Sequence, residues 1–254
     1  MTEPSLAAPL PPGSGIHRRC GYEDHVEARK HIERLRIEVC DLHAELIRWN
    51  LVVWTAGNVS ARVPGAELLV VKPSGVDYDK LTPQNMVVTD FDGVVVEGDA
   101  APSSDTYAAG YVYAKLDWVG GVVHTHSTYA TAFAARREPI PCVLTMMADE
   151  FGGEIPVGPF AVIGDDTIGR GIVETLRDHR SKAVLMANHG PFTIGRTARS
   201  AVKTAAMCEE VARTVTIARQ GGDPHPLEPD QIDALYRRYQ NAYGQTITEG
   251  RTSS

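Results

Sequence analysis

The stretch GGVVHTHSTYATAFAAR, residues 120–136, joins two different patterns. Its first part, Gly120–Thr125, is rich in the small and β-branched residues of a short strand. Its second part is rich in alanine and follows Ser127, a residue type that can cap the first turn of a helix. The stretch therefore predicts a strand followed at once by a helix that ends near Arg136, an arrangement typical of α/β proteins.

Two histidines in this stretch, His124 and His126, are separated by one residue. Residues i and i+2 of a strand point to the same face, so the two imidazoles can converge. Two such histidines and a third suit Zn²⁺, which binds neutral imidazole nitrogens and keeps one position open in catalytic sites. His189 is the best third candidate, because it ends another apolar run and is followed by Gly190, which permits close backbone approach.

Simpler interpretations of the histidines stay open at this point. A pair such as His124 and His126 can also be two hydrogen-bonded polar side chains at a strand end. The other histidines lie in predicted helices, tails or a linker, and we expect them to be solvated: His17, His25, His31, His43, His179 and His225.

The rest of the chain continues the alternation of strands and helices. Short apolar runs predict strands at Glu67–Val71, Met86–Thr89, Gly93–Glu97, Phe160–Ile163, Ala183–Ala187 and Phe192–Gly195. Helical spacing predicts helices at about Glu23–Asn50, after Pro102–Asp105, over Ile168–Leu176, at Thr197–Gln220, and at the end to about Ala242. These elements predict one α/β domain, with helices on both sides of a mixed sheet.

The two ends of the chain differ from this pattern in composition. The first 16 residues are rich in Pro, Ala, Gly and Ser, which bury too little apolar area to offset the entropy of ordering. We therefore expect a flexible N-terminal tail over residues 1–22, the domain over residues 23–246, and a C-terminal tail over residues 247–254.

Charge and cysteine usage limit the partners and the compartment. The formal net charge is −7, and the absence of a basic run argues against nucleic acid or an anionic membrane as a partner. The apolar runs are too short to span a bilayer. Four scattered cysteines without a CxxC pair predict reduced thiols and a cytoplasmic protein: Cys20, Cys40, Cys142 and Cys208.

Three turns of small polar residues are candidates for binding an anion. Pro102–Asp105 combines two hydroxyls and a carboxylate with the N–H groups of a predicted helix start, where a serine can also act as the cap. Gly57-Asn58 and Ser74-Gly75 lie next to predicted strands and could add donors for a phosphate. The plainer alternative is a helix cap and two ordinary turns.

Five motifs, in this order, resemble the class II aldolase/adducin family: GNVSAR from Gly57, VKPSGV from Val71, PSSDT from Pro102, VVHTHS from Val122 and ANHGPF from Ala187. That family contains L-fuculose-phosphate and L-rhamnulose-phosphate aldolases and L-ribulose-5-phosphate 4-epimerase. The resemblance runs from about Arg34 to Gln245. It implies a three-layer αβα sandwich with a mainly antiparallel central sheet, and a homotetramer whose active sites lie between subunits.

The resemblance also implies roles for individual residues. His124, His126 and His189 would hold Zn²⁺, or another divalent ion such as Mn²⁺ or Co²⁺, and Asp105 would be a further ligand or contact the metal. The positions that match the family's phosphate site, with a lysine beside them, are Gly57, Asn58, Lys72, Ser74, Gly75, Ser103 and Ser104. A metal held there can stabilise the enediolate left when a carbon–carbon bond of a ketose phosphate breaks.

The motifs are divided between epimerase and aldolase. Asp105 after the serine pair, Asp149, and Tyr243 in the AYGQ segment resemble the epimerase, in which Asp149 would serve as the base and Tyr243 as the acid. Met147 and Glu150 replace the histidine and tyrosine that flank the aspartate there, and Ile155–Ile163 looks more like the aldolases. We therefore expect a metal-dependent epimerase acting on a ketose phosphate such as L-ribulose 5-phosphate. The alternatives are a class II aldolase and a non-catalytic adducin-like binding module, which the intact histidine set argues against.

Overall fold

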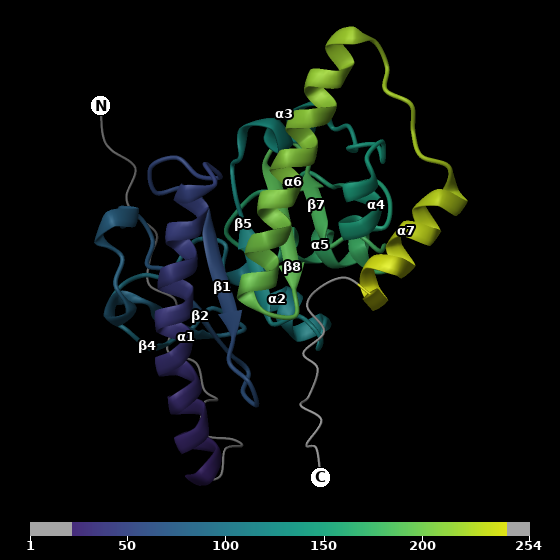
Figure 1. Ribbon diagram of the computed structural model, residues 1–254. Helices are drawn as coiled ribbons and strands as arrows, with labels where there is room; N and C mark the ends of the chain where they lie inside the picture. The colour runs from purple at the N-terminus through teal and green to yellow at the C-terminus, as the bar shows by residue number, and fades with distance from the viewer. Residues whose placement is uncertain (1–21, 243–254) are drawn as a thin grey trace, which may run out of the picture.

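The computed structural model describes residues 22–242, whose helices and strands are shown in Figure 1. The helices are α1 (Tyr22–Arg48), α2 (Thr106–Lys115), α3 (Thr128–Arg136), α4 (Thr145–Phe151), α5 (Thr167–Leu176), α6 (Ala198–Ala218) and α7 (Pro229–Ala242). The strands are β1 (Asn58–Arg62), β2 (Leu68–Val71), β3 (Val87–Asp90), β4 (Val95–Glu97), β5 (Gly121–His124), β6 (Val157–Gly158), β7 (Ala183–Met186) and β8 (Gly190–Gly195). The predicted tails lie almost wholly outside the described residues.

The strands of residues 22–242 form one sheet of eight in the order β4-β3-β2-β1-β5-β8-β7-β6. Neighbouring strands are antiparallel except for β6 and β7, which are parallel. The sheet is therefore mixed and mainly antiparallel, as predicted. Strand β5 lies in the middle of the sheet, between β1 and β8, and it pairs with β8 from Gly121 opposite Gly195 to His124 opposite Phe192.

Helices pack against both faces of this sheet. Because successive strand residues point to opposite faces, neighbours in one strand enter different apolar clusters. Val70 and Val123 pack with residues of α1 and α6, whereas Leu69, Val71 and Val122 pack with residues of α2 and α5. A third cluster joins α3, α4 and α6 to β7, with residues of α7 packed against it. This burial of both faces fixes the register of the central strands, since a shift by one residue would exchange the faces.

The prediction for the first helix is confirmed. Its apolar residues recur at steps of three and four, and they are buried along one side of α1: Ile32, Leu35, Val39, Leu42 and Leu46. The helices predicted after Asp105, over Ile168–Leu176, after Thr197 and up to Ala242 are also present.

One predicted strand is wrong. Phe160, Val162 and Ile163 are exposed and belong to no strand, and the edge strand β6 lies at Val157–Gly158 instead. Prolines at 156 and 159 flank β6. Since proline has no N–H to give to a ladder, pairing with β7 cannot extend far in either direction.

The position of one predicted helix cap is confirmed, but neither predicted cap makes a capping hydrogen bond through its side chain. Ser127 stands at the N-cap of α3, but its side chain makes no capping hydrogen bond. Glu209 of α6 instead accepts hydrogen bonds from the backbone N–H groups of Tyr129 and Ala130, at 2.9 Å each. The N-cap residue of α2 is Asp105 rather than a serine, and its carboxylate does not cap the helix either. The free N–H groups of α3 are therefore satisfied from a neighbouring helix.

The described thiols agree with the prediction from cysteine spacing. Cys40, Cys142 and Cys208 are free, and burial raises the pKa of the Cys142 thiol to about 11. Over residues 22–242, none of the helices combines the length and the apolar character needed to cross a membrane.

Candidate active site

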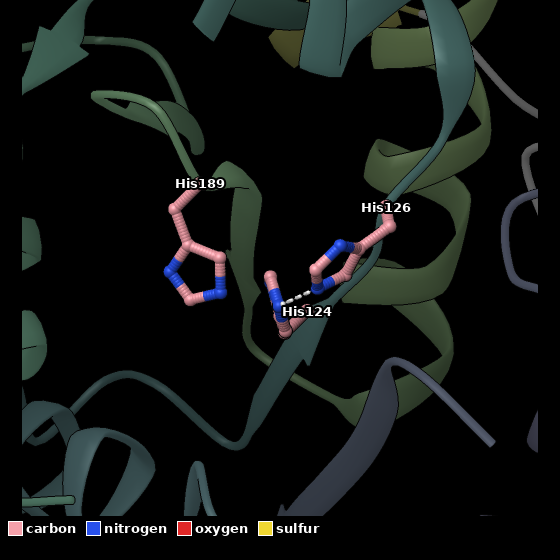
Figure 2. Close-up of side chains that lie close together, drawn as sticks. All are labelled: His124, His126 and His189. Carbon is pink, nitrogen blue, oxygen red and sulfur yellow. Dashed lines mark hydrogen bonds between the residues drawn. The ribbon is translucent and has the colours of Figure 1, made fainter. Parts of the chain in front are cut away.

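Three histidine side chains meet where β5 ends and β8 begins (Figure 2). His124 is the last residue of β5, His126 follows two residues later, and His189 comes directly before β8. One potential ligand atom from each residue lies within 4.8 Å of the others. The structure thus brings together the three residues that were predicted as metal ligands.

The reason given for the convergence of His124 and His126 is only partly right. Strand β5 ends at His124, so His126 lies in the segment between β5 and α3 rather than on the strand. Their Nε2 atoms are nevertheless 2.9 Å apart, and their ring centroids are separated by 4.7 Å. On the other side, Gly190 is required by packing, because a Cβ there would lie 2.8 Å from the carbonyl oxygen of Thr125. The predicted close backbone approach is confirmed.

The orientation of His124 is set by groups around its ring. Its Nδ1 lies 3.1 Å from the carbonyl oxygen of Pro191, and the ring stacks on Phe192 at a centroid distance of 4.1 Å. A carbonyl oxygen can only accept, so this hydrogen bond requires the proton on Nδ1 and leaves the Nε2 lone pair toward His126. A hydrogen bond of this kind on the far nitrogen is how metal-binding imidazoles are commonly oriented.

All three imidazoles are held in the neutral form that a metal requires. Desolvation lowers the pKa of His124 to about 3 and that of His189 to about 4, and the neighbouring imidazoles add to both shifts. Desolvation also lowers the pKa of His126, against the opposing effect of Asp105. The cluster is therefore ready to donate lone pairs at neutral pH without losing protons.

Asp105 is buried near the histidines. Its Oδ2 accepts a hydrogen bond of 2.7 Å from the side-chain amide of Asn58, which is paired with His124 across β1 and β5. Its Oδ1 is buried and has no hydrogen-bond partner among the described residues. Burial raises the pKa of this carboxyl, although His189, Asn58 and Lys72 all act to lower it. A buried carboxylate oxygen without a partner is unusual, and a cation would satisfy it.

The two serine-containing loops run side by side. The backbone N–H of Ser74 donates to the carbonyl of Ala101 at 2.8 Å, and that of Ser103 donates to the carbonyl of Lys72 at 3.1 Å. Ser74 and Ser104 are exposed, whereas Ser103 is buried. The structure therefore brings the VKPSGV and PSSDT motifs together, and it links them to Asn58 through the neighbouring Asp105.

The two predicted turn glycines serve different purposes. Gly57 has φ of 82°, and a Cβ there would lie 2.7 Å from Val52 and 2.9 Å from the carbonyl oxygen of His124. Gly75 has φ of 66° and open space around it, so its requirement is conformational only. Gly57 thus lets the GNVSAR turn lie directly against the end of β5.

Lys72 is buried between these turns. Its Nζ donates to the carbonyl of Pro73 at 3.3 Å and lies 5.5 Å from the ring centroid of Tyr78. Burial lowers the pKa of this lysine, and the charge of Asp105 opposes that change. A buried ammonium with one weak hydrogen bond is suited to an anionic partner.

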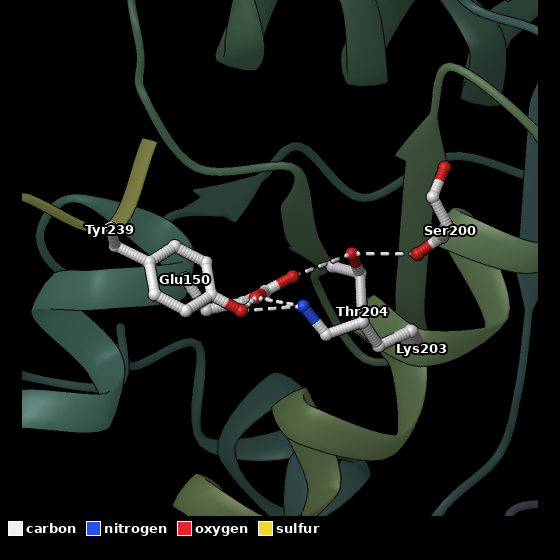
Figure 3. Close-up of polar contacts among 5 residues, drawn as sticks. All are labelled: Glu150, Ser200, Lys203, Thr204 and Tyr239. Atoms are coloured by element: carbon white, nitrogen blue, oxygen red, sulfur yellow. Dashed lines mark hydrogen bonds and ion pairs between the residues drawn. The ribbon is translucent and has the colours of Figure 1, made fainter. Parts of the chain in front are cut away.

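Of the two predicted acid and base residues, only Asp149 lies among the described residues, and there it has no hydrogen bond to the histidine cluster. Asp149 lies on α4, and its Oδ1 is buried without a hydrogen-bond partner among the described residues. Tyr243 lies outside the described residues. Beside Asp149, the Glu150 carboxylate accepts hydrogen bonds from Lys203 at 2.7 Å and from Tyr239 at 3.0 Å (Figure 3). This contact joins α4 to α6 and α7.

Sequence reasoning missed one buried polar residue close to the site. His43 was expected to be solvated, but it is buried on α1 and accepts the backbone N–H of Val59 on its Nε2 at 3.0 Å. The signal was present in the helical spacing. His43 lies four residues after Val39 and three before Leu46, which places it on the buried side of the helix.

Comparison with known proteins agrees with this geometry. Residues 37–216 match the family described as Class II Aldolase and Adducin N-terminal domain. The chain therefore belongs to the class II aldolase/adducin family, as the five motifs had indicated.

Within this family, the chain is similar to epimerases in sequence and to aldolases in structure. It is 42% identical to the L-ribulose-5-phosphate 4-epimerase UlaF of Salmonella paratyphi B, over 87% of this chain and 100% of that protein. An L-fuculose 1-phosphate aldolase structure matches with a TM-score of 0.77 and 28% identity, covering 82% of this chain and 96% of that one. The L-fuculose-1-phosphate aldolase of Thermus thermophilus has a TM-score of 0.65 at 24% identity, covering 76% of this chain and 98% of its own, and shows the fold alone.

Proposed function

We propose that this chain is a metal-dependent sugar-phosphate epimerase that acts on a ketose phosphate such as L-ribulose 5-phosphate by retro-aldol and aldol steps. The observation that carries the proposal is the cluster of His124, His126 and His189 beside the buried Asp105. The 42% identity to an L-ribulose-5-phosphate 4-epimerase over that protein's whole length supports the choice of substrate.

The residues present fit a divalent metal, and we propose Zn²⁺ held by the three histidines. Neutral imidazoles with one oriented lone pair are ligands of the type Zn²⁺ prefers, and Mn²⁺ or Co²⁺ could also bind. The unpartnered Oδ1 of Asp105 supports a cation at this place, either bound directly or through water. When bound, the metal supplies Lewis-acid stabilisation of the oxygens that become negative as the C3–C4 bond of the sugar breaks.

The substrate phosphate is assigned to the adjoining loops. Asn58, Lys72 and the two exposed serines, Ser74 and Ser104, offer amide, ammonium and hydroxyl donors to an anion. Gly57, Gly75 and Ser103 would shape these turns or give backbone N–H groups. The chain is acidic overall, so such local donors must hold a phosphorylated substrate.

We assign the proton transfers to Asp149 and Tyr243. Epimerisation requires removal of the C4 hydroxyl proton on one face and its return on the other, after the aldehyde fragment has turned. Asp149 lies on α4 and has no hydrogen bond to the histidines among the described residues, so this assignment is coupled to a second proposal. The chain would form a homotetramer, with sites between subunits, and each three-layer αβα subunit would contribute acid–base groups to a neighbour.

A class II aldolase is the second candidate. The structural similarity to an L-fuculose 1-phosphate aldolase supports it, because the histidine cluster would suit either reaction. An aldolase would release dihydroxyacetone phosphate and an aldehyde, whereas an epimerase keeps both fragments bound until they recombine.

The experiment is a product analysis with L-ribulose 5-phosphate and a panel of other ketose phosphates. Metal-loaded protein should convert L-ribulose 5-phosphate to its C4 epimer, followed by ¹³C NMR, without accumulation of free aldehyde. A free aldehyde as the main product would support the aldolase instead. If the metal-loaded protein produced neither an epimer nor an aldehyde from any member of the panel, both assignments would be wrong.

A further inference from the structure

His43 of α1 lies beneath the turn that leads into β1. Its Nδ1 lies 2.7 Å from the carbonyl oxygen of Val39, and its Nε2 lies 3.0 Å from the backbone nitrogen of Val59. A carbonyl can only accept and an N–H can only donate, so the ring is neutral with its proton on Nδ1. Strand β1 pairs with β2 only from Ser60 onward, so the imidazole supplies the partner for Val59 that a strand would otherwise provide.

Tyr78 extends this arrangement to the other side of the turn. Its ring centroid lies 5.7 Å from that of His43, and its hydroxyl is shared between the carbonyls of Ala56 at 2.9 Å and Gly57 at 3.2 Å. The ammonium of Lys72 lies 5.5 Å from the centroid of the same ring. One buried histidine and one tyrosine thus contact the turn, the start of β1 and the lysine.

Packing alone does not account for a histidine at this position. The buried side of α1 is otherwise apolar, and an apolar side chain there would need no hydrogen bonds. His43 makes both of its possible hydrogen bonds, and one of them holds Val59. The residue before Val59 is Asn58, whose side chain donates to Asp105. The residue held by His43, Val59, is therefore next in sequence to Asn58, which contacts the candidate active site directly.

We propose that His43 is a positioning residue for phosphate binding, which acts with Tyr78 to hold the Gly57-Asn58 turn and Lys72 in the geometry that receives the substrate's phosphate. This inference rests on the proposed function, because it takes these groups as the phosphate site. The inference gives α1 a role in substrate affinity, although no residue of α1 belongs to any of the five motifs.

The test compares His43→Leu with His43→Gln in the metal-loaded protein. Leucine leaves the Val59 N–H without a partner, whereas the glutamine amide oxygen can accept it at about the position of Nε2. His43→Leu should raise KM for the sugar phosphate, and Kd for inorganic phosphate measured by calorimetry, about tenfold. Its kcat should stay within about twofold, because the phosphate contacts stabilise the bound substrate and the transition state equally. His43→Gln should recover most of the affinity.

A control separates positioning from general loss of stability. Leu46→Val lies one turn further along the same buried side of α1, and it should lower the melting temperature without changing KM or phosphate Kd. Phosphate Kd unchanged in His43→Leu, or raised equally in Leu46→Val, would overturn the inference while leaving the proposed function in place. A wild-type protein that bound no phosphate would overturn both.

Discussion

The histidine cluster and the α4–α7 edge of the molecule hold their polar groups in different ways. The histidines lie at or next to the end of β5 and the start of β8, and His124 is oriented by a backbone carbonyl and a stacked ring. At the edge, α4 is only seven residues long and is tied to α6 and α7 by side chains around Glu150. The centre is therefore preformed by the fold, whereas the edge depends on charged side chains that substitution or salt can disturb.

The largest effect is expected at the centre. His126→Ala should remove one metal ligand, lower metal occupancy measured by elemental analysis, and reduce kcat/KM by on the order of 10³-fold, the scale for losing electrostatic stabilisation of a developing anion. His225→Ala, which alters an exposed histidine of the linker before α7, should change neither quantity. Full activity in metal-free protein would remove the basis for calling this cluster a metal centre.

The next largest effect is expected for the two residues proposed as base and acid, Asp149 of α4 and Tyr243, which lies outside the described residues. Asp149→Asn and Tyr243→Phe should each slow epimer interconversion by on the order of 10²-fold, the usual scale for a general acid or base, with metal content unchanged. This pattern would separate the proposed proton-transfer residues from the proposed metal ligands. Near-normal rates in both variants would reject the assignment.

The contact that ties α4 to its neighbours can be tested through stability. Glu150→Gln leaves Lys203 without an ionic partner and should lower the free energy of unfolding by about 1–3 kcal/mol in urea titrations. Tyr239→Phe should cost less, because a hydrogen bond is lost and no charge. The matched surface variant Glu210→Gln, in an exposed pair with Arg213, should cost at most about 0.5 kcal/mol. Equal losses of unfolding free energy in Glu150→Gln and Glu210→Gln would show that the Glu150–Lys203 contact stabilises the protein no more than an exposed ion pair does.

The smallest effect is expected for the pH dependence of stability, through the buried His43 of α1. Burial lowers the pKa of His43 to about 3, below the unfolded value near 6.5, so between these values the unfolded chain binds the extra proton. Stability therefore falls as pH decreases through this window. From pH 6.5 to 5.5, the wild type should lose about 1 kcal/mol more than His43→Gln, as judged by urea titrations at each pH. Parallel pH profiles would mean that His43 is not held neutral.

Most of the fold is predictable from the sequence, because helices and strands that bury apolar side chains have a regular spacing or run of apolar residues. The spacing in α1 and the apolar runs of β2, β3, β5 and β7 are confirmed for this reason. The strand predicted at Phe160–Ile163 failed because apolar composition alone does not show burial, and the flanking prolines were the better signal. The short helix α4 was missed because seven residues carry too little periodicity.

The candidate site was predictable to a similar extent. The motifs identified the residues that meet at the end of β5, since each lies in a turn of recognisable composition. They could not identify His43, which acts on a backbone N–H from a helix distant in the sequence. The roles proposed for Asp149 and Tyr243 require contacts between subunits, and such contacts carry no comparable motif in the sequence.

The carbonyl of Pro191 has a consequence for how this protein can change. The group that orients His124 belongs to the main chain, so no side-chain replacement at position 191 removes the acceptor itself. Substitutions can therefore alter the preference for the proposed metal more readily at Asp105 or Asn58, which act by their side chains, than through the orientation of this imidazole. Relatives that use different metals should therefore differ at these two positions. The tautomer of His124 should be the same in all of them, because a main-chain carbonyl sets it.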